Sequence, residues 1–204
     1  MNRLDKPGRA VFLDKDGTLI VDIPYNVDPA SITLAPGAPE GLARLHKAGY
    51  RLVVISNQSG VARGRFAAEA LVPVESRLRE LLAEVGVPLA GFYFCPHHPE
   101  GSVPEYATTC DCRKPKPGML ILAAEELGID LSRSWFIGDI LNDVEAGHRA
   151  GCRSVLLDVG NETEWVAGPD RTPDFTASDL LQAANLILQA DASLASNPPT
   201  GARA

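Results

Sequence analysis

The sequence predicts an α/β fold with a doubly wound parallel sheet, and three observations lead to this prediction. Short β-rich runs alternate with helical patterns along most of the 204 residues, which is typical of a parallel sheet covered by helices. Several of the runs are apolar almost throughout, as expected of strands buried on both faces. Polar residues follow the strands that look central, and ligands bind at the carboxyl ends of such strands.

Five strands and five helices are expected in alternation. The predicted strands are residues 10–13, 51–56, 91–95, 134–138 and 153–158, and the predicted helices are residues 38–48, 71–85, 117–127, 142–150 and 178–190. We expect Pro73 to delay or kink the second helix and Pro117 to be the first helical residue of the third. Two long irregular connections, residues 20–34 and 96–116, begin at strand ends, where functional loops gather in such sheets.

Length and composition predict a single domain over residues 1–190, followed by a disordered Ser/Pro/Gly/Ala-rich tail over residues 191–204. A net charge of −7 argues against a nucleic-acid or anionic-membrane partner. The amino-terminal residues lack the apolar core of a signal peptide. We therefore expect a cytoplasmic protein that acts as a monomer.

Two acids one residue apart, Asp14 and Asp16, directly follow the first strand. An isolated charge is costly at a buried strand end, so a cation is expected there, and a hard divalent metal is the natural candidate. The alternative is a strand that runs into an acidic turn. Three further polar clusters lie near strand or helix ends. The end of the second strand carries Ser56, Asn57, Gln58 and Ser59, and Arg113 and Lys114 precede the third helix. The fourth strand is followed by Asp139, Asn142 and Asp143.

Each cluster also has an ordinary structural interpretation. Ser56 and Asn57 suit a turn, Lys114 suits a solvated loop, and Asp139 with Asp143 suits a helix start. Parallel topology, however, brings these strand ends to one edge of the sheet. Carboxylates, a divalent metal and a lysine are the groups that stabilise phosphoryl transfer, so the set predicts one phosphate-handling site.

Taken in chain order, these residues resemble the four motifs of the haloacid dehalogenase (HAD) superfamily: Asp14-Lys15-Asp16-Gly17-Thr18, Ser56-Asn57, Lys114 and Gly138-Asp139-x-x-x-Asp143. The resemblance implies that Asp14 is the nucleophile and that Asp16 is the general acid and base. It also implies that Ser56 and Lys114 bind the phosphoryl oxygens. Mg²⁺ would be held by Asp14, Asp139 and the Asp16 backbone carbonyl, with Asp143 in support.

A Cys-x-His at residues 95–97 and a Cys-x-Cys at residues 110–112 lie on either side of a loop of moderate length. Cys95, His97, Cys110 and Cys112 would give three thiolates and an imidazole, a closed set typical of structural Zn²⁺. His97 suits the metal better than His98, its alternative, because one intervening residue lets both side chains turn to the same ion. The competing interpretation is two accidental cysteine pairs in a reducing compartment. Cys152 is expected to be a buried small residue.

A HAD phosphatase with such a zinc loop resembles two groups that lack a large cap domain, the heptose 1,7-bisphosphate 7-phosphatases and the histidinol-phosphatases. Residues 57–64, 95–103 and 110–115 look specifically like the heptose enzymes. The resemblance implies that a phosphorylated sugar is the substrate and that Arg113 contacts the sugar or its second phosphate. The residues expected to line the pocket are Asp22, Tyr25, Asn57, Gln58 and Ser59. A HAD-fold protein that binds a phosphorylated metabolite without catalysis is the remaining alternative.

Overall fold

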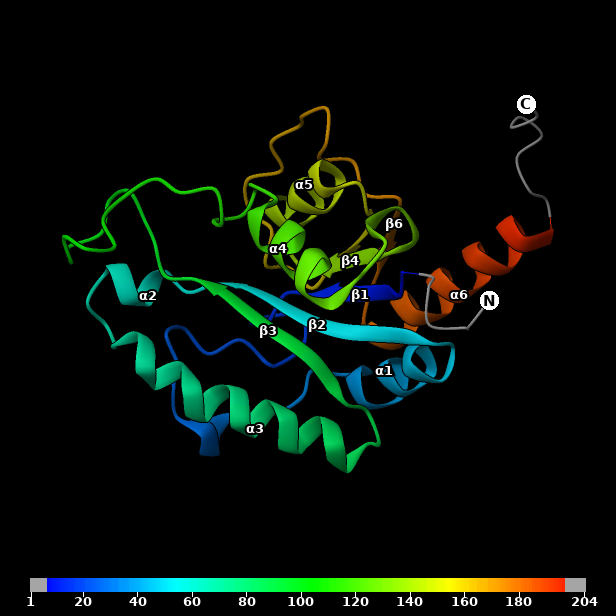
Figure 1. Cartoon of the computed structure of the whole chain (residues 1–204), viewed down its shortest axis with the longest axis horizontal. Helices are drawn as coiled ribbons and strands as arrows, with labels where there is room; N and C mark the ends of the chain where they lie inside the picture. The colour runs from blue at the N-terminus through cyan, green and yellow to red at the C-terminus, as the bar shows by residue number, and fades with distance from the viewer. Residues whose placement is uncertain (1–6, 197–204) are drawn as a thin grey trace.

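Six parallel strands form one sheet in the computed structural model, which describes residues 7–196. Their order is β3-β2-β1-β4-β5-β6 (Figure 1). The strands are β1 (Arg9–Leu13), β2 (Tyr50–Asn57), β3 (Leu89–Cys95), β4 (Trp135–Gly138), β5 (Arg153–Leu157) and β6 (Phe175–Ala177). The parallel α/β fold predicted from the sequence is thus confirmed, and five of the strands lie within two residues of their predicted positions.

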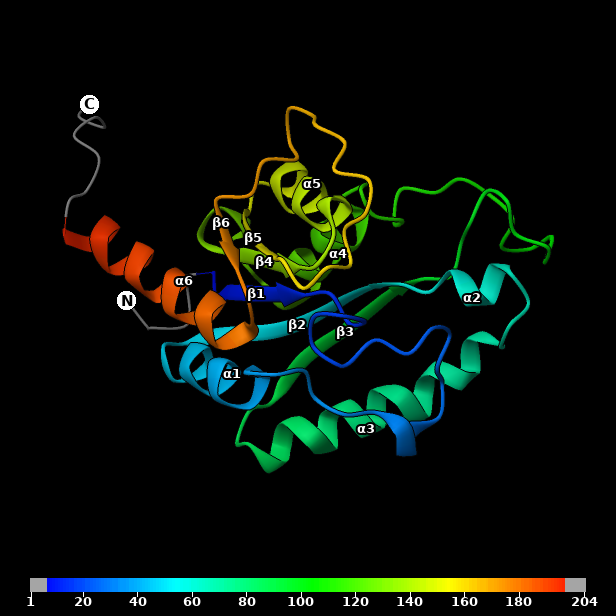
Figure 2. The ribbon, with the colours of Figure 1, turned by 180° about the vertical axis from the view of Figure 1, so that it is seen from behind.

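Helices cover both faces of the sheet (Figures 1 and 2). They are α1 (Ala38–Lys47), α2 (Ser59–Ala62), α3 (Leu71–Glu84), α4 (Gly118–Leu127), α5 (Leu141–Ala150) and α6 (Leu180–Ser196). Side chains alternate across β1: Val11 and Leu13 pack with α1, α3 and α6, whereas Ala10 and Phe12 pack with α4 and α5. Two buried layers thus hold β1 at the centre of the sheet, between β2 and β4.

Three sequence-based expectations need correction. Helix α3 begins at Leu71, before Pro73 rather than after it, because the first amide groups of a helix have no intrahelical acceptor and a proline there loses no bond. Strand β6 was not predicted, since three residues carry no readable alternation. Helix α6 runs to Ser196, so residues 191–196 of the predicted tail are helical. The rest of that tail lies outside the described residues.

Asp191, the first residue of the predicted tail, joins α6 to the sheet. Its carboxylate accepts hydrogen bonds from Arg9 Nη1 at 2.7 Å, Arg153 Nη2 at 2.6 Å, Trp135 Nε1 at 3.4 Å and the Tyr50 hydroxyl. Arg9 also lies over the Tyr50 ring and Arg153 over the Trp135 ring, an arrangement that adds cation–π attraction. One carboxylate thus joins α6 to the starts of β1, β2, β4 and β5.

No helix among the described residues is both long enough and apolar enough to cross a membrane.

Replacing Asp191 with alanine should lower the free energy of unfolding by about 2–3 kcal/mol, because two partly buried guanidinium groups lose their carboxylate. Urea unfolding would measure this change. Glu80→Ala is a suitable control, since Glu80 is 65% exposed in its pair with Arg77 and an exposed pair contributes at most about 1 kcal/mol. Equal losses in the two variants would show that the Asp191 network does not hold α6.

Candidate active site and metal cluster

The predicted site residues meet at the carboxyl edge of the sheet. β1 lies between β2 and β4 in register, so the residues that follow these three strands are neighbours. The connection between β3 and α4 brings Lys114 into contact with Asp14 and Asp143 at this edge. The residues gathered there are Asp14, Asp16, Ser56, Asn57, Lys114, Asp139 and Asp143.

Lys114 is the cation at the centre of this edge. Its ammonium group contacts the Asp14 carboxylate, lies 2.6 Å from Asp143 Oδ1 and donates to the Ile55 carbonyl at 3.1 Å. The side chain is 1% exposed. Burial alone would lower the pKa of Lys114, but the two carboxylates outweigh it and raise the pKa above its ordinary value. Lys114 therefore remains charged next to Asp14.

The contact with Lys114 does not fully compensate the negative charge of the buried Asp14 carboxylate. Burial, with smaller contributions from Asp143 and Asp16, raises the pKa of the Asp14 carboxyl to about 7, against the opposing effect of Lys114. Burial and Asp14 likewise raise the pKa of Asp139 to about 6. Both carboxyls would gain from a further cation at this edge.

Asp14, Asp139 and Asp143 are buried, and each offers an oxygen atom within 4.8 Å of the others. Carboxylate oxygens are the ligands that Mg²⁺ prefers, and the raised pKa values fit a site designed for a cation. Asp143 is already engaged, because Oδ1 faces Lys114 and Oδ2 accepts from the Ile140 amide at 3.3 Å. Asp14 and Asp139 are thus the residues suited to hold Mg²⁺, while Asp143 holds Lys114.

Gly17 lets the acidic turn after β1 lie directly against Asp139. Its φ is +81°, and a Cβ atom there would lie 2.3 Å from Asp139 Oδ2, so any side chain would collide with that carboxylate. The next residue, Thr18, donates from its hydroxyl to Asp139 Oδ1 at 3.2 Å. Asn161, from the segment after β5, donates to Asp139 Oδ2 at 2.7 Å.

Asp16 points away from the three clustered carboxylates. Lys15 Nζ lies 2.5 Å from Asp16 Oδ1, and Gln58 Nε2 donates to Asp16 Oδ2 at 3.1 Å and to Ser56 Oγ at 2.7 Å. The Lys15 ammonium is buried despite its charge. Gln58, predicted to bind substrate, thus fixes the Asp16 carboxyl and the Ser56 hydroxyl relative to each other.

Asn57, also predicted to bind substrate, uses its side-chain amide on the backbone of Lys114. Its Nδ2 donates to the Lys114 carbonyl at 3.1 Å, and its Oδ1 accepts from the Lys114 amide at 3.0 Å. This reciprocal pair joins the end of β2 to the connection before α4. Asn57 therefore positions Lys114, although it also lines the neighbouring pocket.

A pocket of about 280 Å³ opens beside Asp16. Among its lining residues are the predicted substrate contacts Asp22, Tyr25, Asn57, Gln58 and Ser59. The remaining lining residues are Lys15, Asp16, Pro24, Asn26 and Gly60. Burial and the nearby Asp16 raise the pKa of Asp22. Tyr25 is exposed and has a φ of +58°, a conformation that non-glycine residues adopt rarely. The loop after β1 thus forms one wall of the pocket, as predicted.

Arg65 lies next to a residue of this pocket, and Arg63 and Arg113 lie near each other around His98. Arg65 is stacked over the Tyr25 ring at 5.6 Å. Arg63 contacts His98 Nε2 at 3.1 Å. Burial, together with the positive charges of Arg113 and Arg63, lowers the pKa of His98. Planar guanidinium groups bind phosphate in a bidentate manner, so this arginine cluster (Arg63, Arg65 and Arg113) suits an anionic ligand.

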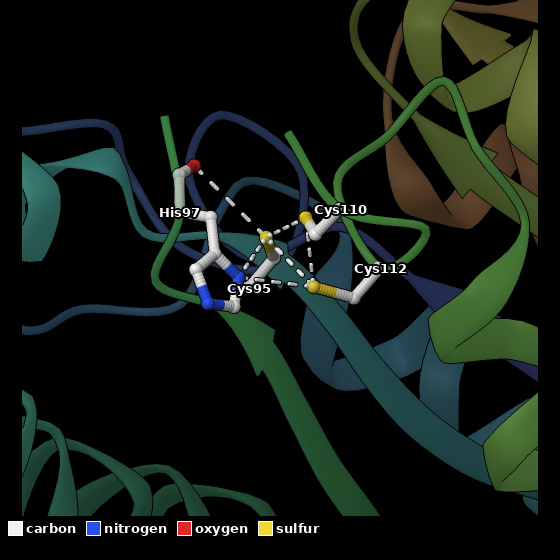
Figure 3. Close-up of side chains that lie close together, drawn as sticks. All are labelled: Cys95, His97, Cys110 and Cys112. Atoms are coloured by element: carbon white, nitrogen blue, oxygen red, sulfur yellow. Dashed lines mark hydrogen bonds between the residues drawn. The ribbon is translucent and has the colours of Figure 1, made fainter. Parts of the chain in front are cut away.

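Cys95, His97, Cys110 and Cys112 point toward one another in Figure 3. The sulfur atoms are 3.0–3.4 Å apart, and His97 Nδ1 lies 3.4 Å from Cys112 Sγ and 3.7 Å from Cys95 Sγ. All three cysteines are free thiols. His97 rather than His98 lies in the cluster. Three sulfurs and one nitrogen around a single point fit the ligand set of a structural Zn²⁺.

One thiol of the cluster, that of Cys112, is favoured in its ionised form. The hydrogen bond between Cys95 and Cys112 is the largest effect on both thiols. It lowers the pKa of Cys112 to about 5, together with the bonds to Cys110 and His97 and against burial, and it raises the pKa of Cys95. Metals bind the thiolate form. Cys152, by contrast, is buried away from the cluster, as expected, and burial raises its pKa to about 12.

The metal cluster is joined to the active site through the chain itself. Arg113 and Lys114 directly follow Cys112, and Arg113 Nη1 donates to the His97 carbonyl at 3.3 Å. Residues 96–117, all of which the structure describes, form no helix or strand. The four clustered side chains therefore hold the segment that delivers Lys114 from one side, and Asn57 holds it from the other.

Sequence reasoning gave no role to Lys15, Thr18, Arg63, Arg65 or Asn161. Lys15 and Thr18 lie inside a recognised motif, but sequence alone did not show which way their side chains point. Asn161 follows Gly160 at the carboxyl end of the fifth strand. It lies four residues beyond the end of β5, and the turn at Gly160 brings it back to the edge of the sheet, so a rule based on residues at strand ends did not select it.

Comparisons with known proteins agree with this geometry. The HAD-hydrolase-like family profile matches residues 111–183. A D-glycero-beta-D-manno-heptose-1,7-bisphosphate 7-phosphatase of Photorhabdus laumondii is 40% identical over 185 residues, which cover 91% of this chain and 92% of the relative.

Two solved structures are similar over most of their length. A Mesorhizobium loti protein assigned as a HAD-like phosphatase has a TM-score of 0.77 and 37% identity, covering 92% of this chain and 90% of that one. The D,D-heptose 1,7-bisphosphate phosphatase of B. bronchiseptica, complexed with magnesium and phosphate, has a TM-score of 0.72 and 31% identity, covering 89% and 99%.

Replacing Cys110 with serine should remove most of the bound zinc and increase amide hydrogen exchange in residues 96–116, because a structural zinc site orders the segment that carries its ligands. Metal analysis and exchange mass spectrometry would measure both effects. Cys152→Ala is the matched control, since this cysteine lies outside the cluster, and it should retain its zinc. An unchanged zinc content in Cys110→Ser would contradict the assignment.

Proposed function

Because this chain belongs to the family of D-glycero-beta-D-manno-heptose-1,7-bisphosphate 7-phosphatases, we propose that it hydrolyses the 7-phosphate of D-glycero-D-manno-heptose 1,7-bisphosphate in nucleotide-activated heptose biosynthesis. The observation that carries this proposal is the combination of a buried carboxylate–lysine centre with an arginine cluster beside the adjoining pocket. The first group suits the reacting phosphate and the second suits the phosphate that stays on the sugar.

Asp14 is the nucleophile in this reaction. Its carboxylate oxygen attacks phosphorus, and the bond from phosphorus to the C7 oxygen breaks to leave an aspartyl-phosphate on Asp14. Asp16 gives its proton to the departing sugar oxygen and then, as a carboxylate, takes a proton from the water that attacks the aspartyl-phosphate. The products are heptose 1-phosphate and inorganic phosphate, and Asp14 is regenerated.

The neighbouring residues assist without changing covalently. Lys114 offsets negative charge on the phosphoryl oxygens, and Ser56 donates a hydrogen bond to them. Asp14 and Asp139, with the Asp16 carbonyl, would hold Mg²⁺. The ion, when bound, supplies positive charge that stabilises the transferring group. Zn²⁺ at Cys95, His97, Cys110 and Cys112 has a structural role, since four protein ligands leave no open position for water.

The location and assembly of the enzyme follow from the same residues. Three thiolates that bind zinc must stay reduced, so we place the reaction in the cytoplasm. Every side chain of the proposed site comes from one chain, which makes a monomer competent for catalysis.

Asp14→Asn should lower kcat for phosphate release by about a thousandfold or more, because the amide cannot attack phosphorus. Steady-state release of inorganic phosphate from the bisphosphate measures this loss. Asp158→Asn is the matched control, since Asp158 follows β5 and is exposed. Equal rates for wild type and Asp14→Asn would favour a protein that binds phosphorylated metabolites without catalysis.

A comparison of kcat/KM values tests the substrate. We expect kcat/KM for heptose 1,7-bisphosphate to be about tenfold or more higher than for heptose 7-phosphate or histidinol phosphate, because the monophosphates leave the arginine cluster without a partner. A preference for histidinol phosphate would identify the enzyme as a histidinol-phosphatase with the same chemistry.

A further inference from the structure

We infer that Asn161 is a positioning residue that orients Asp139 toward the catalytic metal, and that Glu162 anchors the segment that carries it. This inference rests on the proposed metal-dependent function. Asn161 and Glu162 lie between β5 and β6, outside the motifs that identified the site. Figure 2 shows this segment passing beside the start of α5.

The Asn161 amide makes a short and directed contact with Asp139. Its Nδ2 donates to Asp139 Oδ2 at 2.7 Å, whereas Asp139 Oδ1 accepts from Thr18 at the longer distance of 3.2 Å. A Cβ atom on Gly17 would lie 2.4 Å from Asn161 Nδ2 and 2.3 Å from Asp139 Oδ2. The amide, the carboxylate and the turn after β1 are therefore packed against one another without space for other side chains.

Glu162 fixes the same segment to helix α5. Its Oε2 accepts from the Leu141 amide at 2.7 Å, and its Oε1 accepts from the Glu164 amide at 2.9 Å. Leu141 is the first residue of α5, and the first amide groups of a helix need acceptors from outside it. Gly160 precedes the pair with a φ of +88°, which turns the chain back toward Asp139.

This arrangement serves a metal ligand in two ways. The short hydrogen bond to Oδ2 fixes the plane of the carboxylate, and Oδ1, which accepts only the longer bond from Thr18, keeps a lone pair for the cation. An amide also favours the ionised carboxylate without adding a positive charge that would repel the metal. Residues that hold a ligand in this manner change metal affinity by about 10- to 100-fold when removed.

Direct metal binding tests the inference without substrate. Zinc-loaded protein, freed of Mg²⁺ by dialysis without a chelator, is titrated with Mn²⁺, and free Mn²⁺ is counted by electron paramagnetic resonance. Asp139→Asn defines which part of the binding belongs to this site. Asn161→Ala should raise the Mn²⁺ dissociation constant by about tenfold. Because Asn161 is exposed, the variant should keep the wild-type Tm.

Kinetics add an independent readout. In Asn161→Ala the half-saturating Mg²⁺ concentration should rise by about tenfold, while kcat at saturating Mg²⁺ returns to within about threefold of wild type. Glu162→Gln should shift the Mg²⁺ requirement in the same direction by a smaller factor, because it weakens the anchor and leaves the amide in place. General damage to the site would instead lower kcat at every Mg²⁺ concentration and overturn the inference.

Asn142→Ala is the matched control. Asn142 accepts from Arg171 at 3.0 Å and so also ties α5 to the segment before β6, but the side-chain hydrogen bonds to Asp139 come from Thr18 and Asn161. It should retain wild-type Mn²⁺ affinity. Equal affinity in Asn161→Ala and wild type, or equal losses in Asn161→Ala and Asn142→Ala, would overturn the positioning role alone. Absence of Asp139-dependent binding in the wild type would overturn the metal-dependent function together with it.

Discussion

The buried contact of Lys114 with Asp14 and Asp143 is the interaction on which the rest of the structure depends. A lysine that is 1% exposed is stable in the charged form only if carboxylates compensate for its lost hydration. Those carboxylates come from the end of β1 and the first turn of α5. Neither would meet Lys114 unless the sheet were parallel with β1 and β4 adjacent. The fold and the charge balance of the site are therefore a single requirement.

Lys114 belongs to a long irregular segment, so the position of its side chain depends on how well that segment is fixed. The segment is fixed from two sides. The reciprocal hydrogen bonds of Asn57 hold its backbone, and the cluster that includes Cys112 lies two residues upstream. Closing a long loop costs conformational entropy, and a metal clip offsets that cost. A structural metal can thus affect chemistry at a distance through the position of one ammonium group.

Much of this arrangement was predictable from sequence, and the failures have physical reasons. Apolar runs located five strands because both faces of the sheet are buried, and parallel topology then brought Asp14 and Asp139 together. Asn161 was missed because its importance depends on a turn at Gly160 that directs it back to Asp139. Asp191 was missed because its partners are distant in sequence and its surroundings resemble a tail. Both depend on tertiary contacts that local patterns do not encode.

Charge explains how one edge of the sheet can serve both the metal and the substrate. The three carboxylates of this edge, Asp14, Asp139 and Asp143, carry three negative charges. Lys114 and a single bound proton together offset two of them, so one negative charge remains, which agrees with the pKa of about 7 at Asp14. In the proposed function, Asp14 and Asp139 would hold a divalent cation, which would supply the compensating charge in place of that proton and keep Asp14 ionised, as a nucleophile requires. In the proposed reaction, the phosphate dianion would meet a centre that is nearly neutral, and the arginine cluster would attract the second phosphate. Local positive charge of this kind would let an acidic chain bind a doubly phosphorylated sugar.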